Sequence, residues 1–307
     1  MTTLYITHRD CHLHDMGDGH PECPQRLAAI DDQLIASGLL PHLAQLEAPK
    51  AMRAHTARVH EEGYLDVLEK TVPGSGTVYL DPDTAMNPHS LDAALRAAGA
   101  AVLATDKVAN GEMENAFCAV RPPGHHAERG RAMGFCMINS VAVAAAHALA
   151  HHCLERVAVI DFDVHHGNGT EDIFPDEPRV MMASTFQHPF YPYSGTQGRS
   201  ERMVNIPLAA GSDGRALRAA VEQHWLPALN AFKPEMLFIS AGFDAHREDP
   251  LAMLNWNEAD YTWVTQQLMA LARDHAGGRI VSMLEGGYDL SALGRSVAVH
   301  VKTLAGL

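Results

Sequence analysis

Two aspartates and a histidine follow a short apolar run at a spacing of two residues. Asp161, Asp163 and His165 come directly after residues 157–160, a run rich in β-branched side chains that predicts a buried strand. Residues two apart in an extended chain point to the same side, so an aspartate and a histidine at this spacing can reach one metal ion together. Polar groups placed directly after a buried strand would be costly without partners, which favours a functional site here.

Three other apolar runs also end in polar groups. These runs and the groups that follow them are 116–120 with His125 and His126, 236–240 with Asp244, and 280–284 with Tyr288. The carboxyl ends of parallel strands share one edge of a sheet, so we expect these groups to converge. Two prolines and a glycine in Arg121-Pro122-Pro123-Gly124 restrict the backbone that carries the tandem histidines.

Asp163, His165 and Asp244 would supply two carboxylates and one imidazole to a metal ion. Three protein ligands and an open fourth position are typical of a catalytic rather than a structural site. Zinc is the predicted metal, and iron(II) or cobalt(II) would also suit an oxygen-rich set of ligands. His166 is predicted to point to the other face of the strand and not to bind the ion.

The elements that must position these groups alternate between strand and helix along the chain. Strands are predicted near 3–8, 116–120, 157–160, 180–185, 204–208, 236–240 and 280–284, and helices near 26–37, 55–70, 90–102, 139–149, 215–230, 258–273 and the C-terminus. Residues 71–88 read as a long loop rich in Gly, Pro and Asp. This alternation predicts one α/β domain over residues 1–307, with a mostly parallel sheet between two layers of helices.

Net charge and cysteine content limit the kinds of binding partner and cellular compartment that we expect. The 307 residues carry a formal net charge of −14, which argues against nucleic acid and against an anionic membrane surface as partners. Five cysteines without paired spacing fit a reducing compartment and exclude a cysteine zinc cluster. With no signal peptide and no apolar run of membrane-spanning length, we expect a cytoplasmic protein.

The motifs together resemble those of the histone deacetylase superfamily, within the arginase/deacetylase fold. They span nearly the whole chain in the expected order: His20-Pro21-Glu22, RPPGHH at 121–126, GFC at 134–136, DFDVHHGNGT at 161–170, AGFDAH at 241–246 and LEGGY at 284–288. Asn168 makes the chain look like the class II branch and its bacterial relatives, because class I enzymes have aspartate there. The resemblance implies hydrolysis of acetyl-lysine or acetylated amines with one zinc ion. Dimanganese relatives need further aspartates where this chain has Gly167 and His246.

The resemblance also implies a role for each polar group of the site. His126 would act as general base, and Asn168 would orient it. His125 would bind Asp161 and act mainly as an electrostatic helper. Tyr288 would donate a hydrogen bond to the developing oxyanion.

Further positions match a substrate channel and its surroundings. Phe135 and Tyr191 would form the apolar walls beside Gly134, Leu251 would lie at the rim, and Arg26 would line an internal product channel. A potassium ion could bind near Asp161, Asp163, His165 and Ser184. Asp81 and Asp83 are interpreted as solvated acids of the long loop, although they could also hold a peptide backbone.

Three functions are compatible with these features. The first is a zinc deacetylase that acts on acetyl-lysine in proteins or peptides. The second is an acetylpolyamine amidohydrolase, which is disfavoured because Leu251 follows Asp249-Pro250 where the polyamine-selective relative has glutamate. The third, an inactive binding module, would require loss of a ligand, a tandem histidine or the tyrosine, and all are present. The oligomeric state is not predicted.

Overall fold

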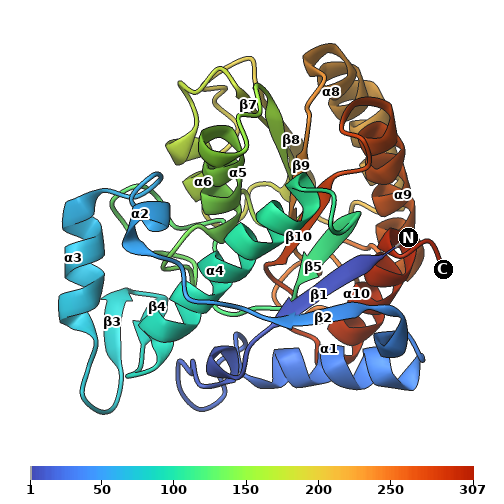
Figure 1. Ribbon diagram of the computed structural model, residues 1–307. Helices are drawn as coiled ribbons and strands as arrows, with labels where there is room; N and C mark the ends of the chain where they lie inside the picture. The colour runs from blue at the N-terminus through green and yellow to red at the C-terminus, as the bar shows by residue number, and fades with distance from the viewer. Residues whose placement is uncertain (1) are drawn as a thin grey trace.

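The computed structural model describes residues 2–307, and an eight-stranded sheet lies at its centre, with all neighbouring strands parallel (Figure 1). In order across the sheet, the strands are β2 (Ala44–Glu47), β1 (Thr3–Thr7), β5 (Asn115–Cys118), β10 (Ile280–Leu284), β9 (Leu237–Ala241), β6 (Val157–Asp161), β7 (Val180–Gln187) and β8 (Met203–Leu208). Strands β5, β6, β7, β9 and β10 are buried along their whole length, which explains their continuous apolar runs.

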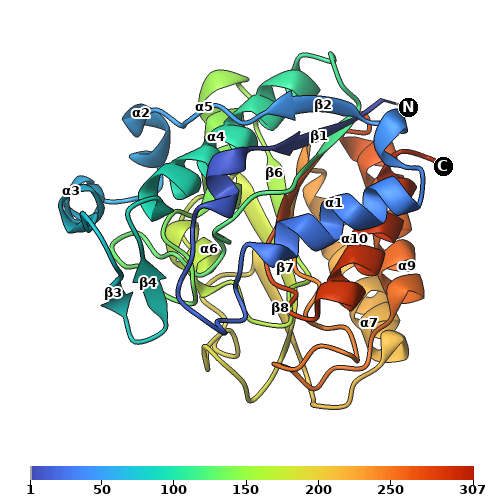
Figure 2. The same ribbon diagram turned by 90° about the horizontal axis from the view of Figure 1, so that it is seen from below.

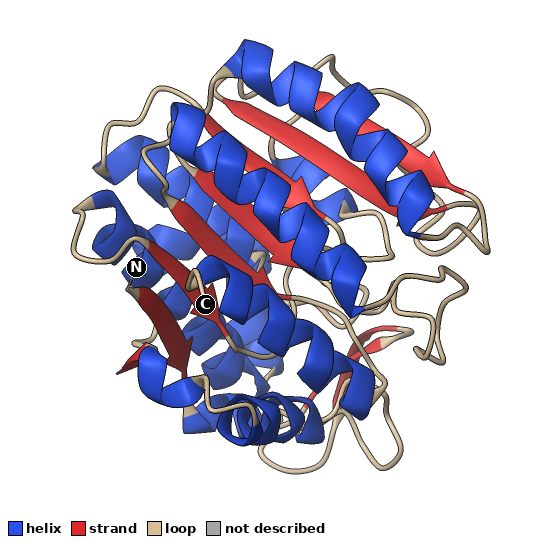
Figure 3. Cartoon of the chain, turned by 90° about the vertical axis from the view of Figure 1, so that its right-hand side faces the viewer, coloured by secondary structure: helices blue, strands red, loops and turns tan. Residues whose placement is uncertain are grey.

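Helices cover both faces of this sheet. On one face, α4 (Ser90–Ala109) packs on β5 and β10, and α5 (Ser140–His151) packs on β6 and β9. On the other face, α10 (Leu290–Leu304) lies between α1 (Gln25–Ala36) and α9 (Glu258–His275) (Figures 2 and 3). The remaining helices are η1 (Arg9–His12), η2 (Leu40–His42), α2 (Arg53–Thr56), α3 (Glu62–Thr71), α6 (Asn168–Ile173), α7 (Gly214–Ala220), the π-helical η3 (Val221–Trp225) and α8 (Leu226–Phe232). The predicted three-layer α/β architecture is confirmed.

The four strands that carry the predicted site are consecutive in the sheet, in the order β5-β10-β9-β6. Their carboxyl ends therefore lie side by side, and the polar groups that follow them meet above one edge. Among residues 2–307, no helix combines the length and the apolar character needed to cross a bilayer.

Two predictions about local structure were wrong, and one strand was missed. The helix expected over 55–70 is interrupted at 57–61, because buried His60 docks on a loop and bridges the Glu128 carbonyl and the Asn139 amide. The expected loop 71–88 contains the antiparallel hairpin of β3 (Val78–Asp81) and β4 (Thr84–Met86). Strand β2 was not expected, since its four residues are mostly exposed at the sheet edge and show no apolar pattern.

Candidate active site

Asp163, His165 and Asp244 meet beyond the ends of β6 and β9. Nδ1 of His165 lies 3.0 Å from Oδ1 of Asp163 and 3.2 Å from Oδ2 of Asp244. Both aspartates are buried, while His165 keeps some exposure toward solvent. Burial alone would lower the pKa of His165, but the two carboxylates raise it to about 10. The site therefore favours a cation between its three ligating atoms.

The arrangement of these atoms fits a bound metal ion. Oδ2 of Asp244 is buried, makes no hydrogen bond of good geometry within residues 2–307 and has Nδ1 of His165 at 3.2 Å, so a bound cation would satisfy both atoms. A Cβ atom on Gly242 or Gly286 would lie 2.1 Å from a carboxylate oxygen of Asp163 or Asp244, so glycine is needed on both sides. Tetrahedral zinc bonded at about 2.0–2.1 Å separates its ligand atoms by roughly 3.3 Å. The distances of 3.0 and 3.2 Å are close to that value.

His125 is paired with a carboxylate behind it. Its Nδ1 lies 3.0 Å from Oδ2 of Asp161, and its Nε2 lies 3.8 Å from Oδ1 of Asp163. Burial would lower the pKa of His125, but Asp161 and Asp163 raise it well above its usual value. Since all these groups are buried, His125 holds a positive charge in the wall of the site.

His126 has a neutral partner and the opposite pKa shift. Its Nδ1 lies 2.7 Å from Oδ1 of Asn168, whose amide nitrogen donates to Oε1 of Glu128 at 2.8 Å. The Asn168 oxygen can only accept, so Nδ1 of His126 carries the proton and Nε2 is free to accept one. Burial and the neighbouring His125 and His165 lower the pKa of His126 well below its usual value. His126 is therefore neutral, as a general base must be.

Gly134 and Phe135 bring a loop directly against His126. A Cβ on Gly134 would lie 2.3 Å from Cδ2 of His126, and its φ of +56° also favours glycine. The backbone amide of Gly134 donates to Oδ1 of Asp83 at 2.9 Å, and that of Phe135 donates to the Thr84 hydroxyl at 3.0 Å. Asp83 is thus a fixed support of this loop, and its interpretation as a solvated acid was wrong.

Aromatic rings surround the approach to the cluster. The Phe190 ring stacks on His165 at 5.3 Å, so it contacts the site rather than only the core. Tyr191 meets His126 edge to face at 5.3 Å, and Phe135 meets Tyr288 in the same way at 6.0 Å. Burial, with Asp83 nearby, raises the pKa of Tyr191. Phe135 and Tyr191 are only partly buried, and each faces a predicted catalytic group, as the walls of a channel must.

Tyr288 is held by its backbone and by a cation under its ring. Its backbone amide donates to Oδ2 of Asp249 at 2.7 Å, and the Arg26 guanidinium lies 5.0 Å from the ring centroid. Burial raises the pKa of Tyr288 well above its usual value. The hydroxyl therefore stays protonated and able to donate.

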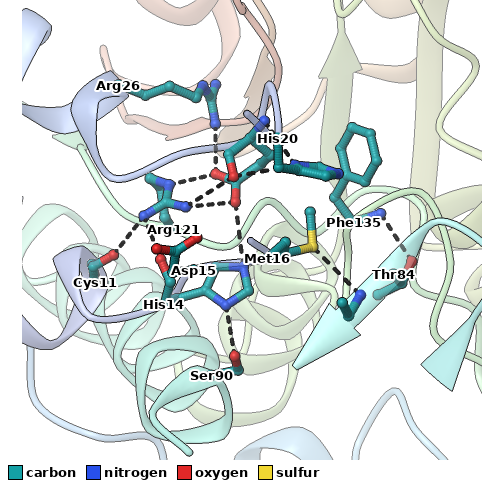
Figure 4. Close-up of polar contacts among 12 residues, drawn as sticks. Cys11, His14, Asp15, Met16, His20, Arg26, Thr84, Ser90, Arg121 and Phe135 are labelled. Atoms are coloured by element: carbon teal, nitrogen blue, oxygen red, sulfur yellow. Dashed lines mark hydrogen bonds and ion pairs between the residues drawn. The ribbon is translucent and has the colours of Figure 1, made fainter. Parts of the chain in front are cut away.

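Arg26 belongs to a buried ion network beneath the site (Figure 4). It donates to the carbonyls of Gly287 at 2.7 Å and Glu285 at 2.5 Å, and to Glu22 at 3.1 Å. Glu22 also pairs with Arg121, the residue that opens the tandem-histidine turn. Both arginines thereby tie the N-terminal segment to the loops that carry the site. The predicted role of Arg26 in a product channel stays a prediction.

Glu285 has a structural role that the motif LEGGY at 284–288 did not predict. This fully buried carboxylate accepts from the amides of Gly124 at 2.6 Å and His125 at 3.1 Å, and from the Ser240 hydroxyl at 3.1 Å. Burial raises its pKa to about 7. A glutamate immediately after a buried strand was the signal that could have identified it as a support for the tandem-histidine turn.

The remaining predicted positions lie at the edges of the site. Ser184 on β7 is paired with Asp161 on the neighbouring strand β6. Its buried hydroxyl has no hydrogen-bond partner among residues 2–307. Leu251 is exposed, and its amide donates to Asp249. His166 bonds to the Ser194 hydroxyl at 2.8 Å, away from the ligand cluster.

Comparisons with known proteins agree on one family. A family model described as the histone deacetylase domain matches residues 20–304. The chain is 38% identical to a histone deacetylase-like amidohydrolase of Pseudomonas aeruginosa, over 88% of this chain and 73% of that protein. It is 37% identical to a probable deacetylase of Archaeoglobus fulgidus, over 94% and 82%.

A third relative and a solved structure extend this comparison. The polyamine deacetylase HDAC10 of Mus musculus is 36% identical over all of this chain and 48% of its own length. The crystal structure of the HDA15 HD domain superposes with a TM-score of 0.93 and 34% identity, covering 99% of this chain and 88% of that one.

Proposed function

The chain belongs to the histone deacetylase family, whose members are deacetylase hydrolases, and we propose that it removes acetyl groups from the ε-amino group of lysine in proteins or peptides. One zinc ion held by Asp163, His165 and Asp244 is part of this proposal. The observation that carries it is the buried convergence of Asp163, His165 and Asp244 at metal-ligand distances, beside a neutral His126.

The bound ion would supply a Lewis acid that polarises the amide carbonyl and lowers the pKa of water. His126 accepts the proton of the attacking water at Nε2, because its Nδ1 proton is committed to Asn168. As the new C–O bond forms and the C–N bond breaks, the same nitrogen returns the proton to the leaving amine. The products are acetic acid and the free amine, and transfer of the acid's proton to the amine gives acetate and the ammonium form.

His125 and Tyr288 stabilise the negative charge that develops on the former carbonyl oxygen. His125 contributes a fixed positive charge, maintained by Asp161. Tyr288 contributes a hydroxyl that remains protonated. Both groups are in place before the substrate binds, which is what makes such stabilisation effective.

The remaining predicted assignments are part of the same proposal. Phe135 and Tyr191 would flank the acyl-lysine chain, with Gly134 leaving room beside His126 and Leu251 at the rim. A potassium ion near Asp161, Asp163 and His165 would satisfy the Ser184 hydroxyl. Asn168 supports the class II branch. A single catalytic domain over residues 1–307, a cytoplasmic location, and no nucleic-acid or membrane partner complete the proposal.

The second candidate function is hydrolysis of acetylpolyamines or other small acylated amines. The similarity to a polyamine deacetylase favours it. Leu251 opposes it, because its side chain cannot pair with a cationic polyamine.

A turnover panel separates the two functions. Acetyl-lysine peptides, longer acyl-lysines and acetylpolyamines are compared by kcat/KM on the metal-loaded protein. We expect acetyl-lysine peptides to be the better substrates. A preference for acetylpolyamines by orders of magnitude would overturn the first function in favour of the second.

A further inference from the structure

A second group of metal-ligating side chains lies on α4 and at the C-terminal end of α5, two helices that pack side by side (Figures 1 and 2). We call it the α4–α5 histidine cluster, and it consists of Asp106, His147, His151 and His152. Helix α5 begins near the active site and ends just before β6 begins. The cluster therefore lies at the opposite edge of the sheet and shares no side chain with the active site.

The cluster has the composition and spacing of a metal site. Oδ1 of Asp106 lies 2.7 Å from Nε2 of His147 and 2.8 Å from Nε2 of His152. The rings of His147 and His151, one helical turn apart, stack at 4.9 Å. One ligand atom from each of the four residues lies within 4.8 Å of all the others. Histidines four apart on one helix are a common zinc-binding arrangement, and Asp106 adds a ligand from the second helix.

The cluster is both preorganised and open to solvent. The His147 side chain is 4% exposed and that of His152 is 11% exposed, so their positions are fixed by packing. His151 is exposed and leaves a path for an ion to enter. Burial lowers the pKa of His147, which favours the neutral imidazole that a metal requires.

Arg58 opposes metal binding in the present arrangement. Its Nη1 lies 3.1 Å from Nδ1 of His147, and arginine can only donate, so the His147 proton resides on Nε2. A metal ion bound at Nε2 would move this proton to Nδ1 and would require Arg58 to turn away. Arg58 is exposed, so its side chain is free to turn into solvent.

We propose that the α4–α5 histidine cluster binds one divalent transition-metal ion, preferably zinc, and that the ion thereby links the two helices. Three imidazoles and a carboxylate are suitable ligands for zinc, whereas an ion pair would use only one imidazole and the carboxylate. The ion would stabilise the fold and would take no part in deacetylation. This inference does not depend on the proposed function.

Counting metal on the full chain tests the inference. Metal-free protein is equilibrated with zinc and its metal content is measured by mass spectrometry. We expect two zinc ions per wild-type chain and one per Asp244→Asn chain. On the Asp244→Asn background, adding His151→Ala and His152→Ala should remove the remaining ion. The exposed His224→Ala, outside the cluster, should leave it bound.

Three further readouts sharpen the test. On the Asp244→Asn background, zinc should raise the melting temperature, and the two histidine substitutions should abolish that rise. Arg58→Met should tighten zinc binding by about fivefold or more, because it removes a positive charge beside the ion. In otherwise wild-type protein, His151→Ala should leave deacetylase activity unchanged. An Asp244→Asn chain that binds no zinc, or a second ion that persists without His151 and His152, would overturn the proposal.

Discussion

At the scale of single residues, the two adjacent histidines differ through their partners. His125 faces the carboxylate of Asp161, whereas His126 faces the amide of Asn168. Their pKa values move in opposite directions, so one histidine holds charge and the other accepts a proton. The sequence motif predicted both histidines, but the roles depend on partners about forty residues away.

Burial and the neighbouring His125 and His165 keep the pKa of His126 low, and neutral Asn168 adds no negative charge to oppose them. A charged replacement of Asn168 should therefore shift the pH–rate profile. Activity requires neutral His126 and is lost as pH falls through its pKa. Asn168→Asp adds a carboxylate that raises this pKa by about one unit or more, and the acidic limb of kcat should move to higher pH by that amount. An unmoved limb in a variant that still turns over would contradict the assignment of His126 as the base.

Tyr288→Phe removes only the hydroxyl that is assigned to the oxyanion. We expect kcat to fall about 100- to 1000-fold while zinc content and melting temperature stay at the wild-type value. Steady-state kinetics on an acetyl-lysine peptide measures the loss. A rate within about twofold of wild type would show that Tyr288 only packs against Arg26 and Phe135.

At the scale of elements, the strands that carry the site were predictable from the sequence, but the side chains that hold its loops in place were not. The buried strands β5, β6, β9 and β10 were recognised because each is a short apolar run followed by polar residues. Glu285, Glu128 and Asp83 were missed because each acts on a residue distant in sequence. The hairpin of β3 and β4 was missed because three- and four-residue strands around Pro82 carry no periodic pattern.

The loop that carries Gly134 should tolerate no side chain. Gly134→Ala places a Cβ against the His126 ring at a left-handed φ, so it should displace the base and lower kcat/KM about 100-fold. Gly198→Ala is the matched control, since no atom lies within 4 Å of its added Cβ. Equal activity of the two variants would show that the loop yields easily and that the close contact has no catalytic importance.

His300 links α10 to its neighbours α9 and β10 and makes stability depend on pH. The Thr265 hydroxyl donates to the Tyr261 carbonyl at 2.7 Å, so it accepts from Nδ1 of His300 at 2.7 Å. Nε2 then accepts from the Ser282 hydroxyl at 2.9 Å, and His300 is neutral. Burial lowers its pKa from 6.5 to about 3.

The sign of this effect follows from which state binds the proton. Between pH 6.5 and about 3 the unfolded chain protonates His300 and the folded chain does not. Its contribution to stability is therefore complete above pH 6.5 and falls by about 1.4 kcal/mol per pH unit below it. Urea unfolding at pH 7 and pH 5 should show a smaller decrease for His300→Gln than for wild type. Equal decreases would contradict a neutral buried His300.

At the scale of the whole molecule, the order of the strands explains why one edge of the sheet holds the entire site. The parallel alternation predicted a shared edge, but only the structure shows that β5, β10, β9 and β6 are neighbours. These four neighbouring strands bring together site residues that are as far apart in the sequence as His125 and Tyr288. The second histidine cluster was not predicted, because Asp106 and His147 belong to helices whose packing the sequence pattern did not reveal.

The central claim is that hydrolysis depends on a metal ion held by Asp163, His165 and Asp244. Deacetylation of an acetyl-lysine peptide is measured on the metal-depleted full chain, before and after zinc is added back. We predict activity at the background level without metal and recovery on addition of zinc, with no recovery in the Asp244→Asn chain. Turnover that survives complete removal of metal would contradict the account.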